Sequence, residues 1–258
     1  MANPLYGSNK FDDLAARVVG DTAAADGGTF RFEDAPLIGD HGGVDTKSSI
    51  HLYSDGLKLF HQNIGTQTAG VNPVATSAGV NYSMDAANDE GNQWALADPN
   101  ARGIWSGPGI QKYVVGSDAF FAKLTFTITD VSGTDDCAFG FRKVEAFQAA
   151  IDSYDEMACL NAISGDIKSE TVINNASTVT TDLTAPSSGD WADGAVHSFK
   201  IKVAADGAVT YELDGTAPTG AVAYSFDAAE VVTPFMYILQ NGTDSAGVIL
   251  HSLEHGRQ

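Results

Sequence analysis

The feature of this chain that most restricts its fold is an alternation of apolar and polar residues, interrupted at intervals by Asp-Gly pairs. It is clearest in WADGAVHSFKIKVAADGAVTYELDG, residues 191–215. From His197 to Val203 every second residue falls on an apolar side, and the residues between are Ser and Lys. This period of two is typical of a half-buried strand. The pair Asp206-Gly207 separates this run from a second one, and such pairs favour tight turns. We therefore predict a β-hairpin whose Asp-Gly pairs serve as turns and need no chemical role.

Similar runs occur along most of the chain, and they predict further strands. In one of them, at 234–240, both faces are apolar, which is typical of a strand in the middle of a sheet that is covered on both sides. Many short strands separated by turn residues favour a sandwich or a barrel. The other runs lie at 50–62, 80–85, 120–129, 137–141, 157–162 and 248–253.

The first 49 residues are rich in glycine and show few alternating runs, so we predict an N-terminal arm over residues 1–49 and one sandwich over residues 50–258. The arm contains a short predicted helix after Ser8 or Asn9, which would cap it, and Gly20 follows its last turn. A second short helix is predicted over 142–151, where Val144, Phe147 and Ile151 have helical spacing.

Composition excludes several classes of partner. The chain of 258 residues carries a formal net charge of −19 with only 14 Lys and Arg, so it would repel nucleic acid and anionic lipid. No apolar run is long enough to span a membrane, and the first residues do not resemble a signal peptide. Cys137 and Cys159 form neither a disulfide framework nor a metal motif, and we expect both to be free and buried.

No pattern of catalytic or metal-binding residues stands out. The acidic run at 152–156 has the wrong spacing for a pair of glycosidase carboxylates, and we interpret it as a solvated turn. The acidic loops at 88–90 and 130–136 lack the ligand spacing of a calcium loop. None of the six histidines has a ligand partner at the expected spacing. Trp94 and Tyr113 are aromatic candidates for stacking on a sugar, but core packing is favoured. We therefore expect no catalytic residue, no metal and no cofactor.

Two resemblances add to these observations. Trp191, Asp193-Gly194 and His197, together with the hairpin that follows and the runs CAFGFRK and GVILHSLEHG, resemble the central strands of concanavalin A-like jelly rolls over about residues 110–258. That family includes lectins and many glucanases. The resemblance implies an all-β jelly-roll β-sandwich, here with a mostly irregular N-terminal arm carrying one short helix.

The first ten residues, MANPLYGSNK, resemble the amino termini of virion structural proteins of tailed bacteriophages. This resemblance implies a non-enzymatic protein, made in the host cytoplasm, that decorates or cements a phage capsid or belongs to a head or tail appendage. Its partners would be the major capsid protein or another virion protein and further copies of itself, with a trimer as one arrangement. The capsid contacts would come from Pro4, Leu5, Tyr6, Phe11, Leu14 and Val18.

Two alternatives of other classes remain. The first is a lectin-like carbohydrate-binding module for host-surface glycans, and the second is a glycoside hydrolase.

Overall fold

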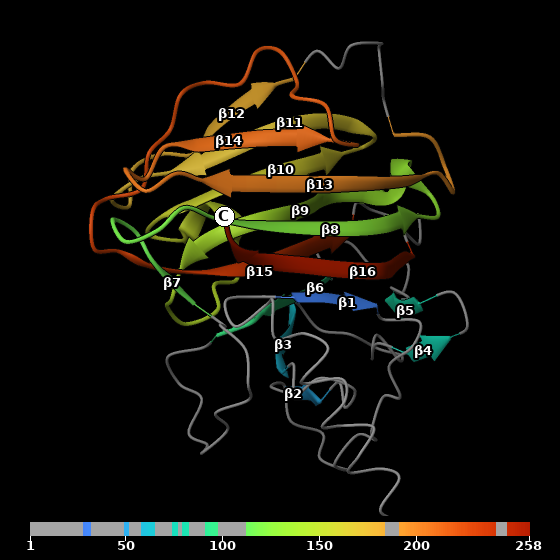
Figure 1. Cartoon of the computed structure of the whole chain (residues 1–258). Coiled ribbons are helices and arrows are strands. Elements are labelled where there is room, and N and C mark those ends of the chain that lie inside the picture. The colour runs from blue at the N-terminus through green and yellow to red at the C-terminus, as the bar shows by residue number, and fades with distance from the viewer. Residues whose placement is uncertain are drawn as a thin grey trace, which may run out of the picture.

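The structure is a sandwich of two antiparallel β-sheets (Figure 1). It is a computed structural model, and it describes residues 28–31, 49–51, 58–64, 74–76, 79–82, 91–97, 112–183, 191–240 and 247–258. The predicted all-β sandwich is therefore confirmed. Within these residues, no helix is both long and apolar enough to cross a membrane.

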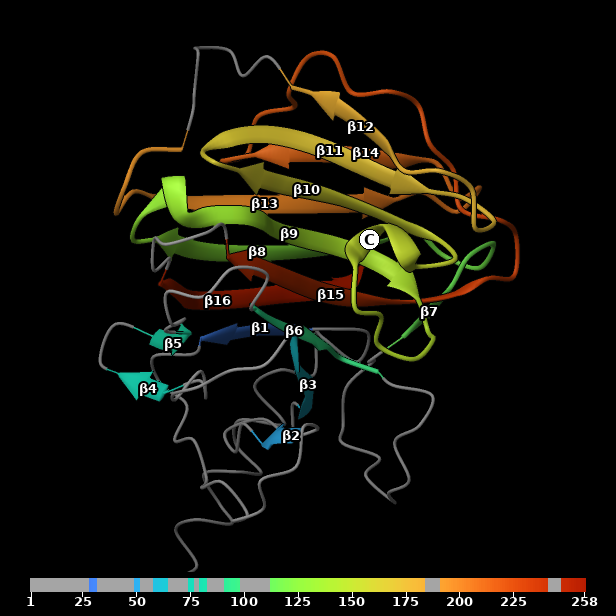
Figure 2. The ribbon, with the colours of Figure 1, turned by 180° about the vertical axis from the view of Figure 1, so that it is seen from behind.

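The seven-stranded sheet faces the viewer in Figure 1, and the nine-stranded sheet comes to the front when the molecule is turned (Figure 2). In spatial order the seven-stranded sheet contains β14 (Val209–Leu213), β13 (Val196–Val203), β8 (Phe120–Ile128), β16 (Val248–Arg257), β5 (Gly79–Tyr82) and β4 (Val74–Thr76), and β1 (Gly28–Arg31) also pairs with β16. The nine-stranded sheet contains β12 (Val179–Asp182), β11 (Asp166–Val172), β10 (Met157–Ile163), β9 (Thr134–Lys143), β15 (Val231–Gln240), β6 (Gly91–Ala95), β3 (Lys58–Ile64) and β2 (Ser49–His51), and β7 (Tyr113–Val114) also pairs with β15.

The core lies between the two sheets because the central strands, such as β8, β13, β9 and β10, turn alternate apolar residues inward. Along β8, Phe120, Ala122, Leu124 and Phe126 are buried, and the residues that alternate with them, Phe121, Lys123 and Thr125, are partly exposed. The core contains an aromatic cluster, in which the centre of the Trp191 ring lies 4.5 Å from the centre of the Phe126 ring and 5.3 Å from that of the Phe199 ring. Buried aromatic side chains of this size supply a large share of the apolar area that drives folding.

The predicted hairpin is confirmed as β13 and β14, which pair in register from Phe199↔Leu213 to Val203↔Val209. Gly207 has a φ of +89°, and a Cβ there would lie 2.4 Å from the carbonyl oxygen of Phe226. The Asp206 carboxylate accepts a hydrogen bond from the Ala208 amide at 3.1 Å, as expected of an Asp that closes its own turn. The Asp-Gly pair is therefore required by the backbone.

The predicted helix over 142–151 is wrong. Arg142 and Lys143 are the end of β9, an irregular loop follows, and a short 3-10 helix, η4, covers Ile151–Ser153. The physical reason is that Arg142 is fully buried. Its guanidinium donates to the backbone carbonyls of Lys143 and Glu145, both at 2.9 Å, which holds the loop in a non-helical path.

The two cysteines are free and buried, as predicted. They lie on opposite sides of the nine-stranded sheet: Cys137 packs in the core between the sheets, and Cys159 packs in a second apolar cluster on the outward side. Side chains on opposite faces of a sheet cannot form a disulfide without moving the backbone.

The division at residue 49 stays a prediction. Gly28–Arg31 lies within the predicted arm, and its backbone pairs with β16 in the seven-stranded sheet, from Gly28↔His255 to Arg31↔Ser252. The predicted helix after Ser8 lies outside the described residues.

Stability will depend on pH through His255. This side chain is 5% exposed, its Nδ1 lies 2.7 Å from the Tyr113 hydroxyl, and burial lowers its pKa from 6.5 to about 4. Because the unfolded chain takes up this proton at a higher pH than the folded chain, stability is complete above pH 6.5 and is lost as the pH falls towards 4. Full loss of this contribution amounts to about 3 kcal/mol.

Chemical denaturation at several pH values will check this dependence. We expect His255→Gln, which does not titrate, to lose less stability than the wild-type chain over that window. Equal losses in both proteins would show that other groups dominate.

Candidate functional site

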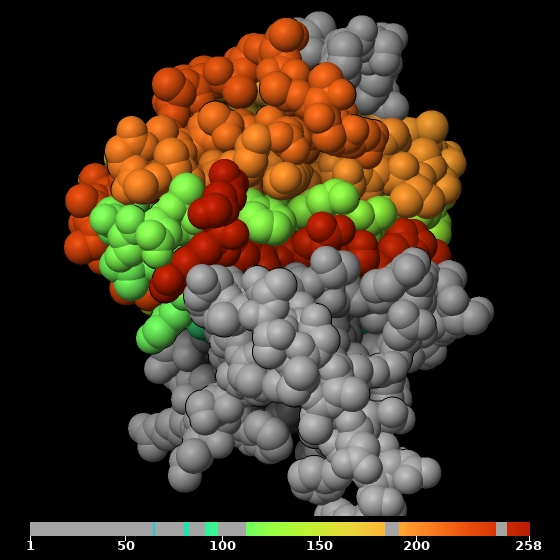
Figure 3. Space-filling view, viewed as in Figure 1, coloured from blue at the N-terminus to red at the C-terminus, as the bar shows by residue number. Residues whose placement is uncertain are grey.

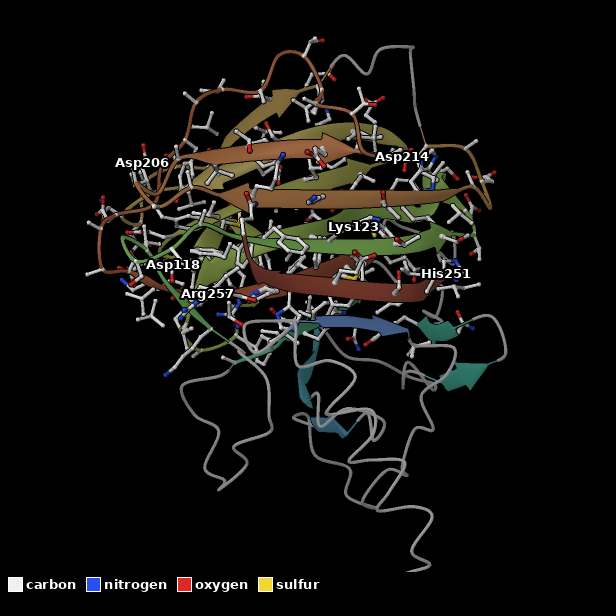
Figure 4. The ribbon with its side chains drawn as sticks, viewed as in Figure 1. Asp118, Lys123, Asp206, Asp214, His251 and Arg257 are labelled. Carbon is white, nitrogen blue, oxygen red and sulfur yellow. The ribbon has the colours of Figure 1, made fainter. Side chains whose placement is uncertain are left out.

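The outward side of strands β14, β13, β8 and β16 in the seven-stranded sheet consists mostly of polar residues. Strands β13, β8 and β16 present it towards the viewer in the space-filling view (Figure 3), and Lys123 and His251 are labelled on it in Figure 4. The alternation of the strands produces this face, because the residues between the core positions all point outward. We call it the polar face because polar residues predominate on it, and it consists of Phe121, Lys123, Thr125, Thr127, Val196, Ser198, Lys200, Lys202, Thr210, Glu212, Ile249, His251, Ser252 and Glu254.

Charged pairs run across the polar face from β16 to β14. Lys123 lies 3.5 Å from Glu254, and Lys200 lies 3.6 Å from Glu212. Glu212 also forms a closer contact with Lys202, and these lysines lower its pKa. Such half-exposed pairs add little to stability individually, but they hold long side chains in defined positions.

One aromatic ring belongs to the polar face. Phe121 is partly exposed, and the Lys200 ammonium lies 5.0 Å from the centre of its ring. An ammonium at this distance from an aromatic ring is attracted to the ring's electron-rich face. The face therefore combines hydroxyl groups, ammonium groups and one apolar ring surface.

His197 lies beside this face, at the start of β13. It is partly buried against Trp191, with ring centres 4.7 Å apart, and its Nδ1 lies 2.7 Å from the Asp214 carboxylate. Asp214 also accepts a hydrogen bond from the Ser198 amide at 2.7 Å. The histidine thus fastens the turn after β14 to the start of β13, which is a structural role.

The outward side of the nine-stranded sheet is different, because the segment between β9 and β10 folds over it (Figure 2). The Arg142 guanidinium lies 4.7 Å from the ring centre of Tyr154 and 5.1 Å from that of Phe147. The Tyr237 hydroxyl donates to the carbonyl of Ala149 at 2.8 Å, and the Gln93 amide donates to that of Gln148 at 2.7 Å. This part of the sheet is therefore covered by the chain itself.

A polar cluster lies on the same side, across β9, β10 and β11; Asn161 and Glu170 are buried in it, and Asp136 is partly exposed. The Asn161 amide nitrogen donates to Asp136 at 2.6 Å and to Glu170 at 2.9 Å, while its oxygen accepts from the Cys137 amide at 2.8 Å. Thr180 donates to the other oxygen of Glu170 at 3.0 Å. We call Asp136 and Glu170, which the Asn161 amide bridges, the amide-bridged pair.

Asp136 is the unusual member of this pair. Burial raises its pKa from 3.8 to about 7; the hydrogen bond from Asn161 opposes that shift, while the charges of Glu170, Asp135 and Asp152 add to it. A carboxyl group that is half protonated near neutral pH is rare and marks candidate functional sites, although structural networks produce the same effect.

The acidic run at 152–156 is only partly the solvated turn that we expected. Asp152 is exposed and Asp155 pairs with Lys143 at 2.6 Å, but Glu156 is only 1% exposed. Burial is the main cause of its raised pKa, and the charges of Glu230 and Asp227 add to it. Glu156 is buried because it directly precedes β10, whose backbone enters the sheet at Met157.

Other predicted candidates also have clear positions. Trp94 and Tyr113 are 0% and 3% exposed, so they are core residues as favoured, and they are not available to a sugar. Asp130, in the predicted loop 130–136, accepts hydrogen bonds from the amide and hydroxyl of Ser132 and caps the short η3 (Val131–Gly133). In the described part of the chain, no group of three His, Cys, Asp or Glu side chains is arranged to hold a metal ion.

The predicted capsid contacts Pro4, Leu5, Tyr6, Phe11, Leu14 and Val18 all lie outside the described residues. The amide-bridged pair was missed at the sequence level because its members lie far apart in the chain. The only local signal is Asn161, a polar residue inside the otherwise apolar run MACLNAI.

Comparison with known proteins supports the fold. No family model and no curated protein matches the sequence. Among solved structures, the carbohydrate recognition domain of Emp47p is similar with a TM-score of 0.50 and 10% identity, covering 83% of this chain and 99% of that chain. At 10% identity, this similarity shows that the two proteins share a lectin-type jelly-roll fold. It carries no information about the ligands of this chain.

Two bacterial proteins give slightly lower scores. A protein of unknown function from Shewanella oneidensis has a TM-score of 0.49 and 10% identity, covering 100% of this chain and 97% of that chain. An alginate lyase from Pseudomonas aeruginosa has a TM-score of 0.48 and 12% identity, covering 74% and 87%.

Replacing Asp136 with Asn should stabilise the protein at neutral and alkaline pH. The folded chain holds a proton on Asp136 up to about pH 7, whereas the unfolded chain releases it near pH 3.8, so stability falls as the pH rises through this range. Asp136→Asn removes that loss, and we expect a gain on the order of 2–4 kcal/mol above pH 7 and little gain below pH 4. Chemical denaturation at the two ends of the range measures it.

The exposed neighbour Asp135 provides the matched control, since Asp135→Asn removes the same charge at a solvated position. A similar gain from both substitutions would mean that the effect comes from net charge and not from burial of Asp136.

Proposed function

We propose that this protein is a carbohydrate-binding module of lectin type, without catalytic activity, and that the polar face is its binding surface. The observation that carries this proposal is the composition of the face: hydroxyl, ammonium and carboxylate groups surround one partly exposed aromatic ring, that of Phe121, on a rigid sheet. Sugar hydroxyls both donate and accept hydrogen bonds, and their ring C–H groups pack on aromatic surfaces.

The rigidity of the face supports the proposal. Its side chains come from four neighbouring strands, β14, β13, β8 and β16. Three of these strands, β13, β8 and β16, are hydrogen-bonded to a neighbouring strand on each side. Ordering side chains before the ligand arrives reduces the conformational entropy lost on binding. The carbohydrate recognition domain of Emp47p has a similar fold, and this analogy of fold supports a carbohydrate-binding role.

A glycan array probed with the full-length chain will test the proposal. We expect reproducible binding to a restricted set of glycans, and we expect Phe121→Ala to weaken it by about tenfold, a loss of about 1.4 kcal/mol. The control is Ile173→Ala, which removes a 40% exposed apolar side chain just after β11, away from the polar face. Absence of binding to every glycan, with the chain shown to be folded, would refute the proposal.

A glycoside hydrolase is the second candidate, and the amide-bridged pair is the observation that favours it. Because Asp136 and Glu170 both accept from one nitrogen, their bonded oxygens lie within about 5.5 Å of each other, near the separation found in retaining glycosidases. The raised pKa of Asp136 would suit a general acid.

Burial weighs against this second candidate. Glu170 is 5% exposed, and both of its oxygens already accept hydrogen bonds, so it is not presented to a substrate as a nucleophile. Asn161 lies between the two carboxylates with no exposed surface. These contacts are typical of a structural polar network.

Incubation with a broad panel of polysaccharides will separate the two candidates. We expect no release of reducing ends by the wild-type chain above the level given by Asp136→Asn and Glu170→Gln. Activity in the wild type that both substitutions abolish would make the protein an enzyme, because a background contaminant would not respond to either change.

Attachment to a phage capsid through the arm stays a prediction. The described residues contain none of the proposed arm contacts, and a decorating role is compatible with glycan binding by the sandwich.

A further inference from the structure

We propose that the glycan bound by the polar face is anionic, and that its carboxylate or sulfate groups are held by Lys123 and Lys200. This inference rests on the proposed carbohydrate-binding function and names the class of ligand. The observation behind it is the placement of two lysines directly opposite each other on neighbouring central strands.

Lys123 of β8 and Lys200 of β13 are register partners in the antiparallel ladder. Side chains directly opposite each other on one face have Cβ atoms about 4.5–5.5 Å apart, and like charges in these positions destabilise the sheet. The strands cannot separate to relieve the repulsion, since β8 lies between β13 and β16 and β13 lies between β8 and β14. An anion placed between the two ammonium groups would remove this repulsion.

The acidic neighbours neutralise these lysines only in part. Lys123 lies 3.5 Å from Glu254, and Lys200 lies 3.6 Å from Glu212, both beyond the usual length of a hydrogen bond. Glu212 makes its short contact with Lys202 instead. Each ammonium carries three donors, so Lys123 and Lys200 retain donors for an external acceptor. These three lysines and two glutamates leave the centre of the face with a small positive charge, on a chain whose net charge is −19.

Phe121 explains why the anion should belong to a sugar. Its ring lies on the same face, 5.0 Å from the Lys200 ammonium. A uronic acid or a sulfated sugar offers both an apolar ring surface for Phe121 and an anionic group for the lysines. A small inorganic anion would use only the lysines, and a neutral sugar would use only the ring and the hydroxyl groups.

The test uses acidic polysaccharides and the same polymers with their charge removed. The full-length chain is titrated with polygalacturonate, alginate and chondroitin sulfate at low and at high salt. It is then titrated with the methyl-esterified forms of the first two polymers and with chondroitin that has been both desulfated and methyl-esterified, so that each control polymer is neutral. We expect binding to at least one acidic polymer, about tenfold weaker or more with its neutral form, and weakened by salt.

Variants assign the contacts. We expect Lys123→Gln and Lys200→Gln each to weaken binding to the acidic polymer by about tenfold. Lys168→Gln is the matched control, because Lys168 lies on β11 of the other sheet and has a distant ion pair with Asp166 at 3.9 Å. It should leave the affinity unchanged. Thermal unfolding of each variant shows that the sandwich is intact.

The outcomes separate this inference from the proposed function. Equal affinity for the acidic and neutral forms, or binding to neutral glycans alone, would overturn the inference and leave the proposed function standing. Binding to no glycan in this experiment or on the array would overturn both. Duplex DNA bound as tightly as the acidic polysaccharide, with the same dependence on the lysines, would also overturn the inference, because the face would then select charge without selecting sugar.

Discussion

The burial of alternate side chains between two sheets is the constraint on which the rest of this structure depends. Strands such as β8, β13 and β10 each contribute one apolar row to the interior, and the other row is left to face outward. Once Phe126, Phe199 and Trp191 pack together, the register of β8 against β13 is determined, because a shift by one residue would turn every inward side chain outward. The position of Lys123 opposite Lys200 is a consequence of that register.

The outward faces of the two sheets differ in what covers them. On the nine-stranded sheet, the segment between β9 and β10 folds back and makes a second apolar cluster, with the Arg142 guanidinium enclosed among aromatic rings. On the seven-stranded sheet, β13, β8 and β16 present their polar row to solvent (Figure 3). One face is therefore used to complete the fold, and the other remains exposed to solvent.

Local sequence was a good guide wherever one strand and its turn decide the structure. The hairpin of β13 and β14 could be predicted because its alternation and the Asp206-Gly207 turn lie within a short stretch. The failure at 142–151 has a nonlocal cause: three apolar residues with helical spacing could not reveal that Arg142 is buried against the rings of Tyr154 and Phe235. The same limit applies to the candidate sites. Asp136, Asn161 and Glu170 meet only through the register of three strands, and the pairing of two lysines also follows from a ladder that no single stretch specifies.

The positions of the two cysteines have a practical consequence. Cys137 and Cys159 are buried on opposite sides of one sheet, and burial raises the pKa of both thiols, so neither is a reactive thiolate in the folded chain. Each becomes accessible to an alkylating reagent only when the layer that covers it opens. The chain thus carries two built-in chemical probes, one for separation of the sandwich halves and one for release of the overlying loop, and their relative labelling rates would reveal which comes apart first.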